Sequence, residues 1–369
     1  MKIVSFTIFG IIGLICLGLL MVFNTTSAEI IDQGVITYIP LLKQTSYICV
    51  GSVAGFLIYQ FGYDKLLTYG REIYLFSIIM LICVFVPKIG LCLNGSSRWV
   101  SVLGISIQPS EFMKVVFPIF YVYLIKRVGT NISFKIFCFW QVLLVIPILL
   151  IIIEPDNGTA FILITTLILL YFITRIRLSY WLIPTGIFSM GLLSAALSMP
   201  HVTARISSYL NPESDILGKG HQAYQAKIAA GCGSYFGRGL GESMQKYHYL
   251  PEARCDYIAA IYAEEFGFFG IVLLVSLYTL IAAMGLSIAF KTRDKHGHYL
   301  AVTYTFMISF GAFLNLGIVS GMLPSKGTNL PFFSSGGSSF LSNLFMIAII
   351  LSIYKKSNAV ENTRLRGIL

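Results

Sequence analysis

Long apolar runs recur along this chain, and they restrict its fold more than any other feature of the sequence. The hydrocarbon core of a bilayer is about 30 Å thick and takes about 20 apolar residues per helix. We expect about ten membrane spans, near residues 3–23, 46–63, 73–91, 111–125, 134–153, 159–174, 179–199, 257–290, 299–322 and 338–354. The run at 257–290 is long enough to include a stretch that approaches the membrane without crossing it. The sequence therefore predicts an all-α polytopic membrane protein in which residues 1–369 form one transmembrane domain.

Composition and charge exclude several other classes of protein. Only 11% of the residues are charged, against about a quarter in soluble domains, which excludes an ordinary soluble enzyme. The 28 Phe and 21 Tyr exclude a disordered chain. The net charge is +10, but basic and aromatic residues do not interleave on a soluble surface, so we expect no nucleic acid partner. Topology signals and a site for an anionic substrate explain the excess of positive charge.

The short loops between the predicted spans differ in their basic residues. One alternating set holds most of them, among them Lys65, Arg71, Lys126, Arg127, Lys291, Arg293, Lys355 and Lys356. The positive-inside rule then places both termini in the cytoplasm and residues 200–256 outside it. This connection is rich in Gly, Tyr and charge, and it is too long to be a simple turn. We expect it to be a large functional extracytoplasmic loop.

Polar residues at the outward-facing ends of the predicted spans form four clusters, the first of which is centred on Ser110. Ser110 is a good N-cap for the fourth span. Glu111 and Lys114 are three residues apart and share a helix face. A Lys one turn inside a membrane helix needs either a partner or a polar cavity. Two interpretations follow: an internal ion pair that locks two helices, or a cation that lines a cavity.

The second cluster surrounds Asp156, and the third lies in the long loop. Asp156 follows Glu154 and Pro155, and residue types alone favour a turn with a helix N-cap at Asp156 or Asn157. The glycine-dense stretch at residues 231–241 has backbone N–H groups that can cradle a phosphate. It follows no predicted strand, so it is not a dinucleotide or P-loop motif.

The end of the long loop carries the most suggestive carboxylate. Asp256 is placed where water meets the protein interior, at the top of a predicted helix. Such a carboxylate can act as a general base or as a metal ligand, although a helix N-cap is the simpler interpretation. Glu264 and Glu265 follow about two turns later, too deep for casual solvation. They need buried cationic partners, and a Lys or Arg of the first cluster is a candidate.

The fourth cluster interrupts the last predicted spans with Pro, Ser and Gly. It covers residues 321–327 and 330–339 and includes Pro324 and Pro331. Two prolines and a Ser/Gly run are incompatible with a continuous helix. Irregular backbone at membrane depth is tolerated only where it is buried in protein or lines a cavity. We therefore expect a re-entrant loop that shapes a pocket.

Taken together, the four clusters resemble the SEDS family (shape, elongation, division and sporulation proteins) of bacterial membrane glycosyltransferases. The matching residues are Arg98-Trp99, Gln108-Pro109-Ser110-Glu111 with Lys114, Pro155-Asp156-x-Gly158, Lys246 with Leu250-Pro251-Glu252 and Asp256, Glu264-Glu265-x-Gly267, and Leu330-Pro331-x-x-Ser334-x-Gly336-Gly337-Ser338. They occur in family order. Gly241-Glu242-Ser243-x-Gln245-Lys246 and Leu323-Pro324-x-Lys326-Gly327 look more like the division member FtsW than the elongation member RodA. Cys255, Tyr257 and Ser335 depart from the residues usual in the family.

This resemblance implies a peptidoglycan glycosyltransferase that polymerises lipid II, the undecaprenyl-pyrophosphate disaccharide pentapeptide, during septal wall synthesis. It implies a class B penicillin-binding protein and other divisome membrane proteins as partners, in the bacterial inner membrane at the division septum. The essential carboxylate of the family maps onto Asp256, with Mg²⁺ or Mn²⁺ as the expected divalent cation and Asp256 as its possible ligand. Expected substrate-binding residues are Arg98, Lys114, Arg238, Lys246, Glu252, Lys326 and Ser334, supported by Glu111, Asp156, Glu264 and Glu265.

Three other functions remain open at this point. A lipid II flippase also needs a polar cavity, but it should place its key charges near the midplane of the membrane. An elongation polymerase of the RodA type would share the same chemistry. A scaffold that only recruits a synthase would require neither Asp256 nor Lys114.

Overall fold

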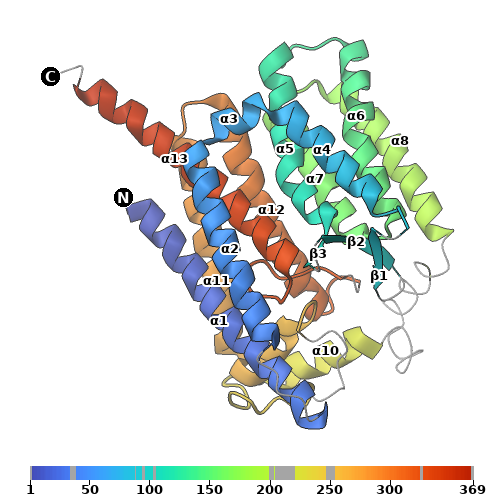
Figure 1. Ribbon diagram of the computed structural model, residues 1–369, viewed down its shortest axis with the longest axis vertical. Helices are drawn as coiled ribbons and strands as arrows, with labels where there is room; N and C mark the ends of the chain where they lie inside the picture. Colours follow the sequence, from blue (N-terminus) through green and yellow to red (C-terminus); the bar gives the residue numbers. More distant parts are fainter. Residues whose placement is uncertain are drawn as a thin grey trace.

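The computed structural model describes residues 2–33, 39–87, 89–93, 96–102, 105–198, 203, 221–246, 254–324 and 327–366. Its elements are α1 (Lys2–Gln33), α2 (Ile39–Phe61), α3 (Tyr63–Thr68), α4 (Gly70–Cys83), β1 (Gly90–Leu93), β2 (Ser96–Val102), β3 (Ile105–Ile107), α5 (Pro109–Val128), α6 (Phe134–Ile153), α7 (Asn157–Ile173), α8 (Leu178–Leu197), α10 (His221–Cys232), α11 (Ile258–Lys291), α12 (Lys295–Val319) and α13 (Gly337–Arg366). The helices form a bundle in which α1 packs on α11, α2 on α13 and α11 on α12 (Figure 1).

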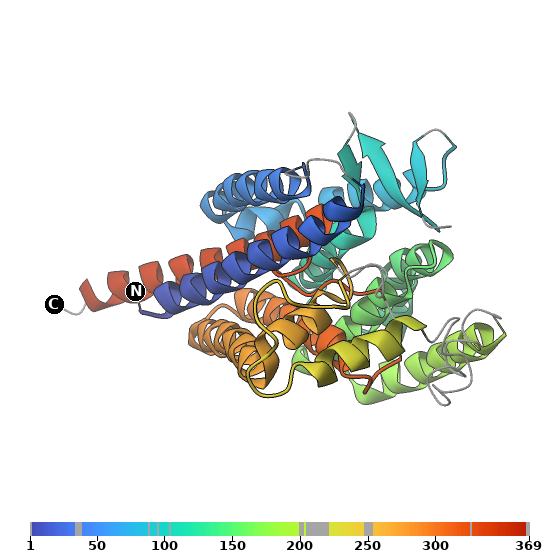
Figure 2. The same ribbon diagram turned by 90° about the horizontal axis from the view of Figure 1, so that it is seen from below.

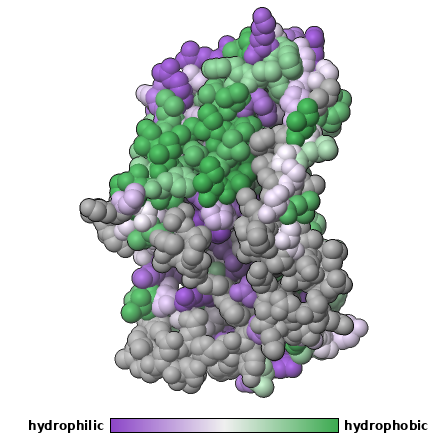
Figure 3. Space-filling model, turned by 90° about the vertical axis from the view of Figure 1, so that its right-hand side faces the viewer, coloured by the Kyte–Doolittle hydropathy of each residue, from purple (hydrophilic) through white to green (hydrophobic). Residues whose placement is uncertain are grey.

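Among the described residues, six helices are long and apolar enough to cross a membrane: α1, α2, α6, α11, α12 and α13. The apolar helix α7 is shorter, with 17 residues. Exposed side chains of α6 such as Phe139 and Val142 are hydrophobic. The face that includes α6 and α8 carries a broad hydrophobic area next to a hydrophilic rim (Figure 3). The prediction of a polytopic helical membrane protein is confirmed, while the number of ten spans stays a prediction.

The start of α1 and the end of α13 lie at the same end of the bundle, and the three strands lie at the other end (Figure 2). Lys356 near the end of α13 pairs with Asp64 of α3 at 2.8 Å. The short segments α3 and 292–294 therefore belong to the end that holds both termini. The opposite end gathers the starts of α2, α5, α7 and α13.

A small antiparallel sheet was not anticipated by the sequence. Strands β1, β2 and β3 pair in that order, with Val100 opposite both Gly90 and Ile107. Helix α4 ends at Cys83, so the span predicted at 73–91 is too long. The residues after Cys83 are still largely apolar. However, Pro87 cannot donate a helical hydrogen bond, and Gly90 disfavours a helix. The apolar residues here enter the sheet, where Val100 is buried.

Helix α11 is interrupted at Gly267, which has a left-handed φ of 64°. The glycine-dense loop enters this break: Phe268 N–H donates to Ser234 at 2.9 Å, and Arg238 N–H donates to the Glu264 carbonyl at 3.0 Å. A Cβ at Gly267 would lie 2.3 Å from Gly237 N, so only glycine allows this approach. The run at 257–290 therefore consists of a short helix and a longer helix that meet at Gly267. That its first part approaches the membrane without crossing it stays a prediction.

Between α12 and α13 the chain forms an irregular loop that is buried in protein. Leu330 and Phe333 are buried, and Tyr278 of α11 donates a hydrogen bond of 2.6 Å to the Pro331 carbonyl. Gly18 of α1 packs so closely that a Cβ there would lie 2.8 Å from the Phe333 carbonyl oxygen. The described part of this loop, from residue 327 to 336, confirms the predicted non-helical segment inside the bundle.

Candidate active site

A cavity of about 660 Å³ opens at the end of the bundle opposite the termini. Residues from α2, α5, α7, α12 and α13 line it, together with β2 and the segments at 254–256 and 327–339. Its charged lining residues are Lys43, Arg98, Lys114, Arg254, Glu111, Asp156 and Asp256. Four of these are cations and three are carboxylates, so the lining carries a small excess of positive charge. Clusters that are far apart in the sequence thus meet around one polar cavity.

Asp256 is half-buried in this lining, directly before α11. The N-cap of α11 is Tyr257, without a side-chain capping hydrogen bond, so the N-cap interpretation of Asp256 is wrong. Gly327 lies beside the carboxylate: a Cβ at this glycine would come within 2.9 Å of Asp256 Oδ2. The absence of a side chain at residue 327 therefore lets the Asp256 carboxylate approach the backbone of this loop closely.

The backbone around Asp256 is held by Asn315 of α12. The Asn315 amide donates 2.8 Å and 2.6 Å hydrogen bonds to the carbonyls of Asp256 and Thr328. Ser335 N–H also donates to the Arg254 carbonyl at 3.1 Å. These bonds join the segment that carries Asp256 to the loop that carries Gly327. Asn315 was not among the residues predicted from the sequence, although an amide deep inside the apolar run at 299–322 is itself a signal of a buried polar contact.

Arg98 of β2 lines the cavity, and its side chain is held there by main-chain carbonyls. Its Nε donates to the Glu154 carbonyl at 3.2 Å and its Nη2 to the Pro155 carbonyl at 2.7 Å. These carbonyls end α6 and are natural acceptors for a cation. The Glu154 carboxyl is buried and has no hydrogen-bond partner among the residues that the structure describes. Burial, and then the nearby Asp156 charge, raise the pKa of Glu154 to about 8, against the opposing effect of Arg98.

Glu111 and Lys114 form an ion pair of 2.6 Å within α5, and both also line the cavity. Their side chains are only 8% and 10% exposed. Ser342 of α13 donates a hydrogen bond of 3.1 Å to Glu111 Oε2. The two interpretations of this pair are therefore compatible, because Lys114 has a partner and still faces the cavity.

Asp156 is the N-cap of α7, as predicted, and accepts a 3.2 Å hydrogen bond from Thr159 N–H. Its other oxygen accepts from the Ser110 hydroxyl at 2.9 Å and from the Gln108 amide at 3.1 Å. The predicted N-cap at Ser110 is wrong: α5 begins at Pro109 with Gln108 as its N-cap, because proline is favoured in the first helical position. Asp156 thus joins the starts of two helices at the cavity wall.

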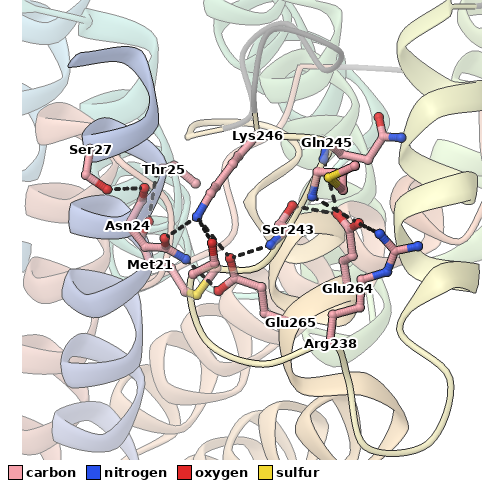
Figure 4. A network of polar contacts seen from close by, with 12 residues as sticks. Met21, Asn24, Thr25, Ser27, Arg238, Ser243, Gln245, Lys246, Glu264 and Glu265 are labelled. Carbon is pink, nitrogen blue, oxygen red and sulfur yellow. Dashed lines mark hydrogen bonds and ion pairs between the residues drawn. The ribbon is translucent and has the colours of Figure 1, made fainter. Parts of the chain in front are cut away.

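The other predicted charges lie in a separate buried network (Figure 4). Lys246 is 3.6 Å from Glu265, and Arg238 is 3.3 Å from Glu264. Asn24 of α1 donates to Glu265 at 2.5 Å and accepts from Lys246 at 2.9 Å. The partners of the two glutamates therefore come from the loop and from α1, so the expectation of a partner from the first cluster is wrong. None of these four charged residues lines the cavity.

The other residues predicted to bind substrate do not line the cavity or lie outside the described residues. The Ser334 hydroxyl is buried and accepts a 2.8 Å hydrogen bond from Leu330 N–H, and Ser334 is not part of the cavity lining. Glu252 and Lys326 lie outside the described residues. The backbone N–H groups of Gly237, Arg238 and Gly239 are occupied by carbonyls of the protein. They cannot form the phosphate cradle considered for this stretch.

The fit of a divalent cation depends on Asp256. The described residues contain no group of three or more His, Cys, Asp or Glu side chains suited to a metal. Mg²⁺ commonly binds through one or two carboxylates and takes its other ligands from water and substrate phosphates. The half-buried Asp256 carboxylate, which lines the cavity, fits a cation bound in that way.

Comparisons with known proteins agree with this geometry. A family model described as cell cycle protein, which covers FtsW, RodA and SpoVE, matches residues 5–359. Stage V sporulation protein E of Bacillus subtilis (strain 168) is 33% identical over 346 residues, which are 93% of this chain and 94% of that protein. The probable peptidoglycan glycosyltransferase FtsW of Trichlorobacter lovleyi is 33% identical over 358 residues, which are 93% of this chain and 91% of that protein.

Solved structures with the same fold include a chain of a peptidoglycan synthase complex, with a TM-score of 0.76, 22% identity and coverage of 95% of this chain and 97% of that chain. The rod shape determining protein RodA of Thermus thermophilus has a TM-score of 0.70 and 20% identity, and the match covers 95% of this chain and 96% of that chain. The resemblance inferred from the sequence motifs is confirmed. The chain belongs to the FtsW, RodA and SpoVE family of cell cycle proteins.

Proposed function

We propose that this protein is a peptidoglycan glycosyltransferase that polymerises lipid II into glycan strands, with Asp256 as its central carboxylate. One observation carries the proposal: Asp256, Arg98 and Lys114 line the same polar cavity at the end of the bundle opposite the termini. The names of the relatives support it, since several are named probable peptidoglycan glycosyltransferase FtsW.

In this reaction an acceptor sugar hydroxyl attacks the anomeric carbon of a lipid-linked donor and loses a proton. The half-buried Asp256 carboxylate accepts that proton as a general base. Its backbone is fixed by Asn315, so the carboxylate does not need to be ordered during the reaction. The cavity is lined by residues of several helices, and this arrangement gives a lipid-tailed substrate a site next to the bilayer.

The leaving group is a lipid pyrophosphate, on which negative charge increases. Arg98 is fixed by two main-chain carbonyls, and no carboxylate neutralises its charge within the described residues. Arg98 is therefore better placed than Lys114 to stabilise the leaving group, because Lys114 is paired with Glu111. Fixed cations of this kind stabilise developing charge without reorganisation.

A divalent cation would be held by Asp256 together with pyrophosphate oxygens of the substrate. Such a cation would neutralise phosphate charge and lower the pKa of a bound hydroxyl. Asp256 then acts as a ligand in place of a base, and the two roles remain alternatives in the proposal.

The cellular setting completes the proposal. The basic short loops favour cytoplasmic termini, which puts the cavity on the outer side of the bacterial inner membrane, where the wall is assembled. A class B penicillin-binding protein that cross-links the strands is the proposed partner, and the solved synthase complex with the same fold is described as coordinating polymerization and crosslinking. The FtsW-named relatives favour division over elongation, with other divisome proteins at the septum.

The test is polymerisation of purified lipid II in detergent by the wild type, Asp256→Asn and Arg98→Gln, with and without Mg²⁺ or Mn²⁺ and partner. We expect Asp256→Asn to lower the rate by a factor of about 10²–10⁴ while the unfolding temperature stays unchanged. Glycan chains formed in detergent cannot result from flipping, so the assay also separates a polymerase from a transporter.

Asp64→Asn is a matched control, because Asp64 is an exposed carboxylate at the end of the bundle that holds the termini. We expect this variant to polymerise lipid II like the wild type. Full activity of Asp256→Asn, or equal losses in both variants, would contradict the assignment of the site.

A further inference from the structure

A second cavity of about 430 Å³ lies at the opposite end of the bundle, next to the termini. It is formed where α11 ends, α12 begins and α13 leaves the bundle. The residues that line it are Tyr63, Lys291, Thr292, Arg293, Asp294, Ile353, Tyr354, Lys356, Ser357 and Asn358. Besides three cations, the lining offers hydroxyl and amide donors, and it is unrelated to the cavity around Asp256.

The charges in this second cavity are unbalanced. Asp294, its one carboxylate, accepts hydrogen bonds from the Tyr63 hydroxyl at 2.8 Å and from Gly297 N–H at 3.0 Å. Lys356 pairs with Asp64. Within the described part of the chain, Lys291 and Arg293 are exposed and form no ion pair with an acid. Two positive charges are therefore available to an anionic ligand.

The surroundings place this cavity at a boundary between hydrocarbon and water. Helices α2, α11, α12 and α13 are all candidate spans, and each has an end here. Phe290, directly before Lys291, is 76% exposed, and Leu286 one turn earlier is 38% exposed. An apolar surface along the span thus leads directly to two uncompensated cations.

We propose that this second cavity binds the phosphate headgroup of an anionic phospholipid, with an acyl chain along the exposed side of α11. Basic pockets between transmembrane helices at the membrane surface recognise such headgroups. A soluble phosphate would use the cations but not Phe290 and Leu286. The observations therefore favour a lipid over a free anion.

The simpler explanation of these basic residues is that they only orient the protein in the membrane. Lys126 and Arg127 at the end of α5 provide the matched comparison. They are also adjacent to the end of a helix and exposed, and they line neither cavity. Removing two charges there changes the net charge equally without touching the proposed site.

The experiment is native mass spectrometry of the full chain after exchange into detergent with phosphatidylglycerol or phosphatidylcholine. We expect the wild type to retain one phosphatidylglycerol and no phosphatidylcholine. Lys291→Gln with Arg293→Gln should weaken retention roughly fivefold for each charge removed, whereas Lys126→Gln with Arg127→Gln should retain the lipid. Thermal unfolding without added lipid checks that both double variants are folded.

Three results would overturn the proposal. Equal retention by all proteins would show that the cavity does not bind the headgroup. Equal losses in both double variants would indicate general surface attraction. Displacement of the bound lipid by millimolar inorganic phosphate would identify a free anion as the ligand. Because no outcome depends on polymerisation, failure here leaves the proposed function untouched.

Discussion

The cavity around Asp256 and the network around Glu265 use the same types of residue in opposite ways. In the network the side chains of Lys246 and Glu265 are 4% and 0% exposed, and each has protein partners on several sides. In the cavity, Asp256 is half-buried and Arg98 is held by main-chain carbonyls. The difference teaches that depth in a membrane bundle does not identify a chemical site. What distinguishes the two regions is that the charged side chains of one line a cavity, whereas those of the other are enclosed by their protein partners.

The largest expected effect is in the network. Lys246→Met leaves Glu265 buried without its cation, and removing one partner of a buried pair costs about 3–5 kcal/mol. We expect the free energy of unfolding in detergent to fall by about that amount, measured by thermal or denaturant unfolding. Lys43→Met is the control, since Lys43 is exposed at the mouth of the cavity, and its stability should be unchanged.

This variant also decides between two roles for Lys246. If Lys246→Met were as stable as the wild type but unable to polymerise lipid II, Lys246 would contact the substrate, as the sequence suggested. The network would then belong to the site, and the contrast with the cavity would fail.

The next largest effect concerns Asn315. Asn315→Leu removes both donors to the carbonyls of Asp256 and Thr328, and each orphaned buried acceptor costs about 1–3 kcal/mol. We expect loss of stability together with a lower kcat, because the carboxylate is no longer held. Asn315→Asp keeps the shape without the amide donors and should lower kcat as well. A change confined to stability, with kcat and KM intact, would mean that Asn315 does not position Asp256.

The stability of the protein should depend on pH through Glu154, which precedes the cavity-lining residues Pro155 and Asp156. The pKa of Glu154 is raised to about 8, chiefly by burial, so the folded protein holds this proton more tightly than the unfolded chain. The stability it contributes is present at low pH and is lost as the pH rises toward 8. Between pH 6 and 8 we expect the wild type to lose about 1–2 kcal/mol more than Glu154→Gln, measured by thermal unfolding. If the stability of the wild type and of Glu154→Gln changed equally with pH, the raised pKa of Glu154 would be contradicted.

The smallest effect is expected at the edge of the network. The Arg238 side chain is 39% exposed, and ion pairs that water reaches contribute little. Arg238→Gln should lower the free energy of unfolding by less than about 1 kcal/mol. Polymerisation should also be retained, since Arg238 does not line the cavity. A large loss of activity in a stable variant would move Arg238 into the substrate site.

Much of the fold followed from hydropathy, because a bilayer requires apolar segments of fixed length. The sheet at residues 90–107 was missed because apolar residues serve a strand as well as a span. The break at Gly267 was signalled only by excess length, since a left-handed glycine looks like any other in a sequence.

The site was predicted only in part, because sequence motifs identify single residues but not the contacts that folding creates between them. The resemblance identified Asp256, Arg98 and Lys114, and the structure brings them to one cavity. The partners of Glu264 and Glu265 were not predictable, because a lysine and an arginine in a loop become neighbours only through folding. Asn315 was not predicted because it lies within an apolar run, and a mean hydropathy over about 20 residues changes little with one amide side chain.

The break at Gly267 has a mechanical consequence. The two turns from Ile258 to Phe266 are stitched to the loop at 233–239 by backbone hydrogen bonds, and they follow directly after Asp256. The same loop is also bonded to the long helix beyond Gly267, because Phe268 and Phe269 N–H donate to the carbonyls of Ser234 and Tyr235. The loop therefore bridges the break in α11 and holds its two parts together, next to the segment that carries Asp256.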